Sequence, residues 1–236
     1  LGKFKFPALI SSVKTLRVKG LCKVNSPKWV WVLKQIQKKF GFSIDVCPNN
    51  RLYNATAIAV EGIENGIDCV TLSFAGVGGR YGYAALEEVL LASRVLLEGN
   101  IDADFKKLQQ ASKVFTKITG MDVSKTKPII GKNIFKYESG IHADGIKKNP
   151  ATYEPFDPSI VGLKRGLSIG KHSGGKSIIT KLEELGVKCS SEEIVEILNL
   201  VREKSIELKR GLMDNEIQKL ISTKIKKVQS EIVSFP

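Results

Sequence analysis

Residues 131–175 read GKNIFKYESGIHADGIKKNPATYEPFDPSIVGLKRGLSIGKHSGG, and the rest of the chain is organised around this stretch. Its Gly and Pro content is too high for long helices or central strands. Both histidines of the protein, His142 and His172, lie in it, and an imidazole is the usual group for moving a proton near neutral pH. Glu138 precedes His142 by four residues, which would place both on one face of a helical turn. The alternative is a surface loop with two ordinary histidines.

The chain before this stretch alternates between strand and helix patterns. Strands are predicted at residues 16–22, 42–46 and 69–74, and helices at 28–40, 54–65 and 84–98. Such an alternation indicates parallel βα units. Ser26 and Pro27 suit the first turn of the helix at 28–40.

The remaining segments are mainly helical in pattern. Helices are predicted at residues 102–119, 176–185, 192–212 and 214–226. Ser190 with Glu193 fits a capping box at the start of the third of these helices. Residues 228–236 fit either a strand or a frayed end.

Composition restricts the class of protein. The 236 residues carry a net charge of +13, with ten Lys or Arg and no acidic residue among the first forty. The four cysteines form no CxxC pair, which argues against a disulfide framework or a zinc knuckle and favours a cytoplasmic setting. No apolar run approaches the roughly 18 residues of a membrane span, and no signal peptide is evident. No nucleic-acid-binding motif accompanies the basic charge, so we expect acidic small molecules or an acidic protein as partners rather than nucleic acid.

Four motifs in the long stretch carry a resemblance to a known family. They are YESGIHADG at 137–145, NPATYE at 149–154, DPSIVG at 157–162 and GKHSG at 170–174. In this order and spacing they resemble the 2-isopropylmalate/homocitrate/citramalate synthase family. The resemblance implies a TIM barrel, then a lid that reaches over the active site of a second subunit, then a small helical subdomain.

The resemblance therefore predicts an α/β fold in three parts. Residues 1–120 would be a partial TIM barrel containing its last three βα units, residues 121–175 the lid, and residues 176–236 the helical subdomain. A (β/α)₈ barrel needs eight strands, so about five are absent from this sequence. We expect the exposed edge and apolar face of the short sheet to pack on another polypeptide.

The loops that follow the three predicted strands lack the residues that the family uses. Cys47 and Asn49 stand where the family has the two metal-binding histidines of His-x-His-Asn-Asp. Gly79 and Tyr83 stand where it has the acid and the final Asn of Gly-x-Gly-Glu-Arg-x-Gly-Asn. Residues 19–21, Lys-Gly-Leu, lack the Asp and Thr of the first loop. We therefore expect this chain to bind no metal or other cofactor, and a partner barrel to hold the divalent Mg, Mn or Zn ion.

The implied reaction is the condensation of acetyl-CoA with a 2-keto dicarboxylic acid, 2-oxoglutarate if homocitrate is the product. His142 and Glu138 are the predicted catalytic residues, and Tyr153, Arg80 and His172 are predicted to contact substrate. For His172 the alternative is a purely structural role in its turn.

We interpret the chain as the C-terminal subunit of a two-chain synthase of the kind that serves nitrogen fixation. Its partner would be an N-terminal barrel subunit or a full-length homologue. Two alternatives remain, an inactive pseudoenzyme that regulates such a homologue and a basic nucleic-acid binder.

Overall fold

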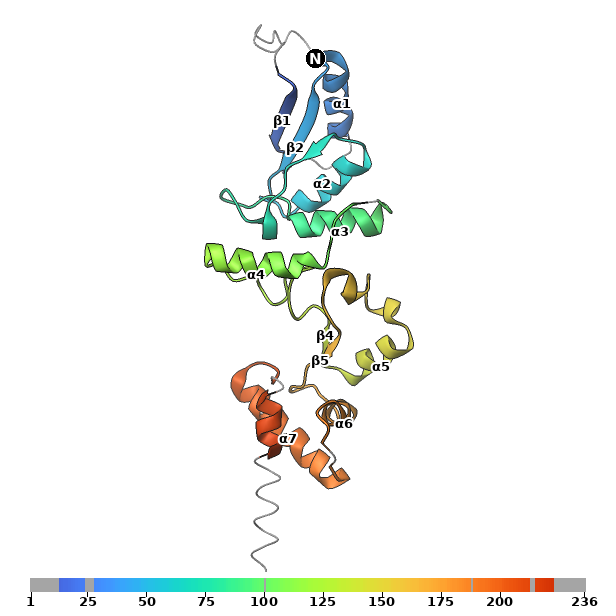
Figure 1. The fold of residues 1–236 in the computed structure, drawn as a ribbon, viewed down its shortest axis with the longest axis vertical. Coiled ribbons are helices and arrows are strands. Elements are labelled where there is room, and N and C mark those ends of the chain that lie inside the picture. Colours follow the sequence, from blue (N-terminus) through green and yellow to red (C-terminus); the bar gives the residue numbers. More distant parts are fainter. Residues whose placement is uncertain (1–12, 24–27, 100, 188, 213–214, 223–236) are drawn as a thin grey trace, which may run out of the picture. The chain divides into compact units, whose positions relative to one another are not determined.

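Strands and helices alternate in the first part of the chain, as expected from the sequence. The computed structural model describes residues 13–23, 28–99, 101–187, 189–212 and 215–222. Contacts between residues divide the chain into two units, residues 1–132 and residues 133–236, and Figure 1 colours the chain from its first residues to its last.

The first unit contains a parallel sheet in the order β1-β2-β3. Its strands are β1 (Thr15–Gly20), β2 (Ser43–Pro48) and β3 (Cys69–Val70), joined through α1 (Lys28–Phe40) and α2 (Ala55–Glu64). The prediction of parallel βα units is therefore confirmed. The predicted first-turn residues of α1, Ser26 and Pro27, lie outside the described residues.

The helices cover one face of this sheet. Ile44 and Val46 of β2 are completely buried in a cluster that includes Trp29 and Leu33 of α1 and Ile58 of α2. Alternation along a strand sends these two β2 side chains to the same face, while the helical spacing of Trp29 and Leu33 turns both toward them. Figure 1 shows α1 running beside the strands.

The opposite face of the sheet is polar, so the expectation of an uncovered apolar face was wrong. Asp45 lies between Ile44 and Val46 and therefore points to this side, where it is only 3% exposed. Its carboxylate accepts hydrogen bonds from Arg17 Nε of β1 at 2.5 Å and from Thr71 Oγ1 at 2.8 Å. Burial of this carboxylate is tolerated because it is paired and hydrogen-bonded.

The third strand is shorter than the predicted 69–74. After β3 the chain turns into a 3₁₀ helix, η2 (Phe74–Gly76), in which Ala75 has a positive φ of 55°. The Ala75 amide donates to the fully buried Glu87 at 3.0 Å, and burial raises the pKa of Glu87. Glu87 belongs to α3 (Leu86–Leu96), and Lys127 lies 3.5 Å from its carboxylate. The turn after β3 is thus fixed by a buried acid twelve residues after Ala75, which the periodicity of the strand does not reveal.

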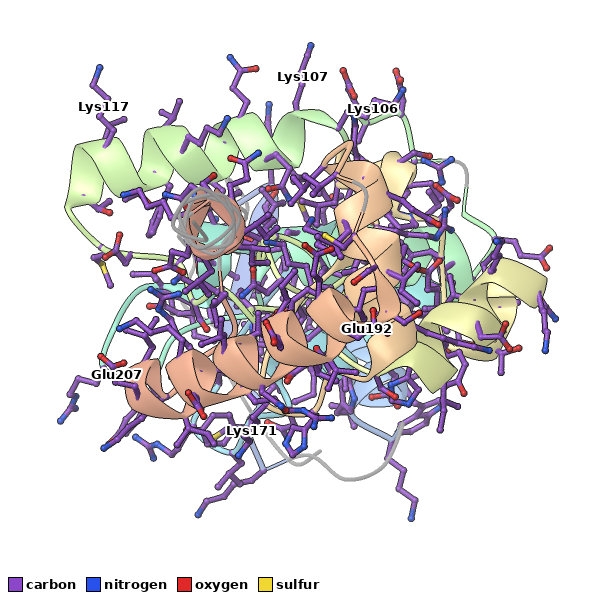
Figure 2. The ribbon with its side chains drawn as sticks, turned by 90° about the horizontal axis from the view of Figure 1, so that it is seen from below. Lys106, Lys107, Lys117, Lys171, Glu192 and Glu207 are labelled. Atoms are coloured by element: carbon purple, nitrogen blue, oxygen red, sulfur yellow. The ribbon has the colours of Figure 1, made fainter. Side chains whose placement is uncertain are left out.

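The last helix of the first unit, α4 (Lys107–Thr119), begins five residues later than predicted. Phe105, just before the helix, and Leu108 are buried, whereas Val114 and Ile118 are 47% and 77% exposed. Figure 2 shows the side chain of Lys117 projecting outward from this helix.

The second unit is built around a two-stranded parallel sheet formed by β4 (Lys136–Tyr137) and β5 (Gly166–Leu167). The segments between these strands are α5 (Gly140–Lys148), η3 (Pro150–Thr152) and η4 (Pro158–Val161). The sheet is followed by α6 (Gly175–Glu184), α7 (Ser191–Leu208) and a helix at residues 215–222.

The helices after β5 enclose the core of this unit, which contains Ile169, Ile178 and Val201. Helix α7 ends four residues before the predicted position 212, because Lys209 adopts a left-handed conformation with φ of 52°. Leu212 then pairs its backbone with Ile169. Residues 223–236, which include the end of the predicted 214–226 helix and the 228–236 segment, lie outside the described part of the chain.

The expected lid and helical subdomain share one unit from residue 133 onward. Arg202 of α7 donates to the Ser173 carbonyl at 3.0 Å, and Ser205 of the same helix accepts from the Lys171 amide at 3.2 Å. These bonds join the end of the lid segment to the longest helix of the subdomain, so the two segments are not structurally separate at this point.

The predicted capping box at α7 is present and provides a test of the fold. Ser190 Oγ accepts from the Glu193 amide at 3.3 Å, and Glu193 accepts from the Ser190 amide at 2.7 Å. We expect Ser190→Ala to lower the free energy of unfolding by about 1 kcal/mol, because it leaves an amide of the first turn without an acceptor. The measurement is urea denaturation followed by circular dichroism. The control is Ser191→Ala, one residue into the helix, and equal losses in the two variants would contradict the capping role.

Candidate functional site

His142 and Tyr153 form an exposed aromatic pair in the second unit. Their ring centroids lie 4.9 Å apart, and the planes are inclined at 67° in an edge-on arrangement. His142 is exposed on α5, and the Tyr153 side chain, just after η3, is 42% exposed. The structure thus brings together two of the five predicted site residues and leaves both accessible to a ligand or partner.

Two local features position Tyr153. The Asn149 side chain accepts a hydrogen bond from the Ala151 amide at 3.2 Å and so caps η3, with Pro150 in its first turn. The ring then passes so close to α5 that a Cβ on Gly145 would lie 2.5 Å from it. Glycine at position 145 is therefore required for the ring to reach His142, although glycine weakens a helix.

Glu138 does not share a helical face with His142, because α5 begins only at Gly140. Its carboxylate instead accepts a hydrogen bond from the backbone amide of His172 at 2.8 Å. Glu138 and His172 are therefore brought together, but through the His172 backbone rather than its ring. The expectation that the four-residue spacing places Glu138 beside His142 on one helix was wrong.

The turn at residues 170–174 has its amides occupied by oxygen atoms from three places. The Gly170 amide donates to Ser173 Oγ at 2.9 Å and the Lys171 amide to Ser205 Oγ at 3.2 Å, while Glu138 takes the His172 amide. Three consecutive amides of this turn are therefore each satisfied by a different side-chain oxygen. Beside the turn lies a cavity of about 490 Å³, lined by Glu138, Lys171, His172, Ser205, Lys209 and Arg210 among others.

Glu154 holds the middle of the long stretch together. It is 5% exposed and accepts from the Tyr137 hydroxyl at 2.9 Å and from Arg165 at 2.6 Å. Arg165 also donates to Asp157 at 2.9 Å. Burial and the bond to Glu154 raise the pKa of Tyr137 to about 12, while hydrogen bonds from Ser159 and Arg165 lower the pKa of Asp157 to about 2. Sequence reasoning missed Arg165, for which no local pattern gives a signal.

Tyr83 fills the Gly-rich loop after the third strand. Gly78 and Gly79 both have positive φ, 141° and 55°. A Cβ on Gly78 would lie 2.8 Å from the Tyr83 ring, and one on Gly79 would lie 3.3 Å from its hydroxyl. The Tyr83 ring therefore packs over Gly78 and Gly79, and position 79 is where the family resemblance implies an acid.

The loop after β2 directs its side-chain oxygens to its own backbone. Asn49 Oδ1 accepts from the Arg51 amide at 2.9 Å, and Asn50 Oδ1 accepts from the Ala55 amide at 3.3 Å. Both oxygens act as turn and helix caps rather than as ligands directed at a common point. Arg80, the remaining predicted site residue, is exposed on the neighbouring loop of the first unit.

Neither a metal cluster nor a membrane span is present in the described residues. Within those ranges no three His, Cys, Asp or Glu side chains lie close enough to hold a metal ion. No helix in the described parts of the chain has the length and apolar character needed to cross a bilayer.

The position of Glu138 predicts a mainly structural role for it. We expect Glu138→Ala to lower the free energy of unfolding by about 1–3 kcal/mol, since it removes a charged acceptor from the His172 amide. Glu207→Ala, which removes an exposed ion pair on α7, is the matched control and should cost under about 1 kcal/mol. Chemical denaturation measures both. An unchanged midpoint for Glu138→Ala would show that the turn does not depend on this carboxylate.

Residues 129–209 match the family model described as homocitrate synthase post-HMGL domain-like. This region covers the His142–Tyr153 pair, the Glu154 network and the turn at residues 170–174. The match therefore falls on the second unit and the few residues before it.

Named relatives extend the similarity over most of the chain. The homocitrate synthase omega subunit of Clostridium pasteurianum is 40% identical over 208 residues, covering 88% of this chain and 58% of that protein. The 2-isopropylmalate synthase 2 of Caldanaerobacter subterraneus is 38% identical over 202 residues, or 86% of this chain and 53% of the relative. The homocitrate synthase 1 of a Nostoc species is 40% identical over 189 residues, or 80% and 50%. The chain thus spans between 50% and 58% of the length of these relatives, and it belongs to the family of homocitrate and 2-isopropylmalate synthases.

Proposed function

We propose that this chain brings His142 to a homocitrate-synthase-type active site whose keto acid and metal are held by another polypeptide. The observation that carries the proposal is the contrast between two parts of the chain. The accessible His142–Tyr153 pair is complete, with its supporting Gly145 and Asn149. The loops that would bind metal in a relative are instead filled by Tyr83 and closed by their own side-chain bonds.

The residues of the first unit do not fit a divalent metal site. Cys47 is buried, and burial raises the pKa of its thiol, which disfavours the thiolate that a metal binds. Asn49 already uses its side-chain oxygen in a turn, and Tyr83 covers the adjacent loop. We therefore assign no step of the reaction to a metal on this chain, and a Mg, Mn or Zn ion would belong to the partner barrel.

The proposed reaction joins the acetyl methyl carbon of acetyl-CoA to the keto carbon of 2-oxoglutarate. A base removes a methyl proton, the resulting carbanion forms the new carbon–carbon bond, and the keto oxygen takes up a proton. Water then cleaves the thioester to give homocitrate and free CoA. Proton transfer at the methyl carbon or the keto oxygen is the role proposed for His142, because its exposed imidazole can act on a substrate held outside this chain.

Tyr153 and Glu138 would support this step in different ways. The Tyr153 ring packs edge-on with the imidazole, an arrangement that aromatic pairs prefer, and would thereby restrict the orientation of the imidazole. Glu138 fixes the end of β4, two residues before α5 begins, through its bond to the turn. We therefore propose that Glu138 acts as a positioning residue for α5, with no proton transfer of its own.

The second candidate function is that of a non-catalytic chain that binds and regulates a full-length homologue. The lost ligand positions of the first unit favour this alternative as much as they favour a shared active site. The two functions differ in whether His142 takes part in chemistry. They therefore predict different results for the same variant.

The test is reconstitution with a homologous barrel that has intact metal-binding histidines. Adding this chain should increase the rate at which CoA is released from acetyl-CoA in the presence of 2-oxoglutarate. With His142→Ala the added rate should be about 10²- to 10⁴-fold lower than with the wild-type chain. His172→Ala, the comparison variant, should raise KM for a substrate rather than lower kcat. Co-sedimentation confirms that both variants still associate with the barrel. Equal rates with wild type and His142→Ala would rule out the catalytic role and leave the regulatory one.

A further inference from the structure

Residues 170–177 read GKHSGGKS, which fits the pattern G-x-x-x-x-G-K-[ST] of phosphate-binding loops. The pattern has value only between a strand and a helix, where amides at the helix N-terminus face the phosphate. Here the segment follows β5 and leads directly into α6, whose first two residues are Gly175 and Lys176. The structural context that the pattern requires is therefore present.

The first half of this loop is not free to surround a phosphate chain. The amides of Gly170, Lys171 and His172 are already bonded to Ser173, Ser205 and Glu138. A complete phosphate-binding loop uses such amides to donate hydrogen bonds to the phosphates of a nucleoside triphosphate. The site that remains is consequently smaller, and it consists of the amides at the start of α6.

The start of α6 is open. No side chain of a described residue caps the helix at Gly174, and the first amides of a helix have no partner within the helix. A Cβ added to Gly174 or Gly175 would meet no heavy atom within 4 Å. An anion can therefore approach these amides closely.

Ser177 gives a second and independent indication of a ligand. It is 2% exposed, yet its hydroxyl has no hydrogen-bond partner among the described residues. A helical serine usually bonds to the carbonyl four residues earlier, but the Ser173 carbonyl accepts from Arg202. Ser177 lines a cavity of about 630 Å³ between α5, α6 and β5. A buried hydroxyl without a hydrogen-bond partner destabilises the fold. A bound ligand that accepts its hydrogen bond would explain why a serine is present here.

Charge within this cavity is positive at the end where α6 begins. Of its carboxylates, Asp144 is paired with Lys148 at 2.8 Å and Glu184 with Lys181 at 3.0 Å. Arg165 is paired in turn with Glu154 and Asp157. The third carboxylate, Glu183, lies seven residues along α6 from Lys176, which is about 10 Å along the axis.

Two lysines of the cavity are left to face an anion. Lys176 on α6 and Lys147 on α5 both line it, and neither forms an ion pair with a described residue. Both act electrostatically on Asp144, which places their charges near the same part of the cavity.

We propose that the N-terminus of α6 binds one phosphoryl group of a small-molecule ligand. The donors are the Gly175 and Lys176 amides, the Lys176 ammonium group and the Ser177 hydroxyl, with Lys147 adding positive charge from α5. The assignment of the ligand as the phosphate-bearing part of an acyl-CoA rests on the proposed function. The phosphoryl site itself rests on α6, Ser177 and the two lysines alone.

The experiment is a titration of the ¹⁵N-labelled full chain with inorganic phosphate, followed by amide shifts. We expect saturable shifts at Gly175, Lys176 and Ser177. Ser177→Ala and Lys176→Gln should each weaken phosphate binding by about tenfold or more, because each removes a donor to a charged group. Lys117→Gln, an equal change of charge on α4, should leave the affinity unchanged. Absence of saturable shifts, or equal affinities in all four proteins, would overturn the proposal.

The source of the phosphoryl group is tested with larger ligands. CoA and 4′-phosphopantetheine should produce the same shifts as phosphate, and pantetheine, which lacks phosphate, should not. Tighter binding of ATP than of CoA would overturn the acyl-CoA assignment. Equal shifts with pantetheine would overturn the phosphoryl site. His142→Ala should retain phosphate binding, so that failure of the phosphoryl site and failure of the proposed function give different results.

Discussion

The hydrogen bond from the His172 amide to the Glu138 carboxylate is the constraint on which the second unit depends. It joins the end of β4 to a turn thirty-four residues later in the sequence. Gly170 packs against the same carboxylate so closely that a Cβ would lie 2.6 Å from Oε1. Helix α5 begins two residues after Glu138, and α6 begins three residues after His172. One carboxylate thus fixes the starting points of the helices that carry His142 and Lys176.

The first unit shows the reverse situation, in which a side chain closes a region where the family resemblance implies active-site residues. Tyr83 occupies the space over Gly78 and Gly79, and a residue with a side chain at either glycine would need a positive φ as well as room beside the ring. The substitutions relative to the family at positions 79 and 83 therefore fit each other. A side chain introduced at position 79 alone would lie 3.3 Å from the Tyr83 hydroxyl at its Cβ, so the acid that the resemblance implies there would also require a change at Tyr83.

Periodic features of the sequence predicted the strands and helices of the first unit and the helices α6 and α7, but none of the short elements between residues 136 and 167. The parallel order of the first three strands, the bounds of α1 and the capping box at Ser190 all follow from local patterns. The length of β3 and the polar face of the sheet do not follow from local patterns. Strand β3 ends early at a turn fixed by Glu87 of a later helix, and the polar face depends on Asp45 pairing with Arg17 across the sheet.

The candidate site was predictable only in part, for the same reason. His142 and Tyr153 were identified from their motifs, and only eleven residues of sequence separate the two rings that are in contact. The partner of Glu138 lies thirty-four residues away and is a backbone amide, which no pattern of side chains reveals. Arg165 likewise acts through two carboxylates brought together by η3 and η4. Residues that act through tertiary contacts to the backbone or to buried acids leave no periodic trace.

The central claim is that this chain carries the lid groups of a synthase without its metal site. Calorimetric titration with Mg²⁺, Mn²⁺ or Zn²⁺, in the presence and absence of 2-oxoglutarate, tests the claim most directly. A homologue with intact metal-binding histidines serves as the positive control, because in the implied reaction the metal polarises the keto acid and each should strengthen binding of the other. We predict that this chain shows no metal binding that 2-oxoglutarate strengthens. Metal binding strengthened by 2-oxoglutarate in this chain alone would contradict the account.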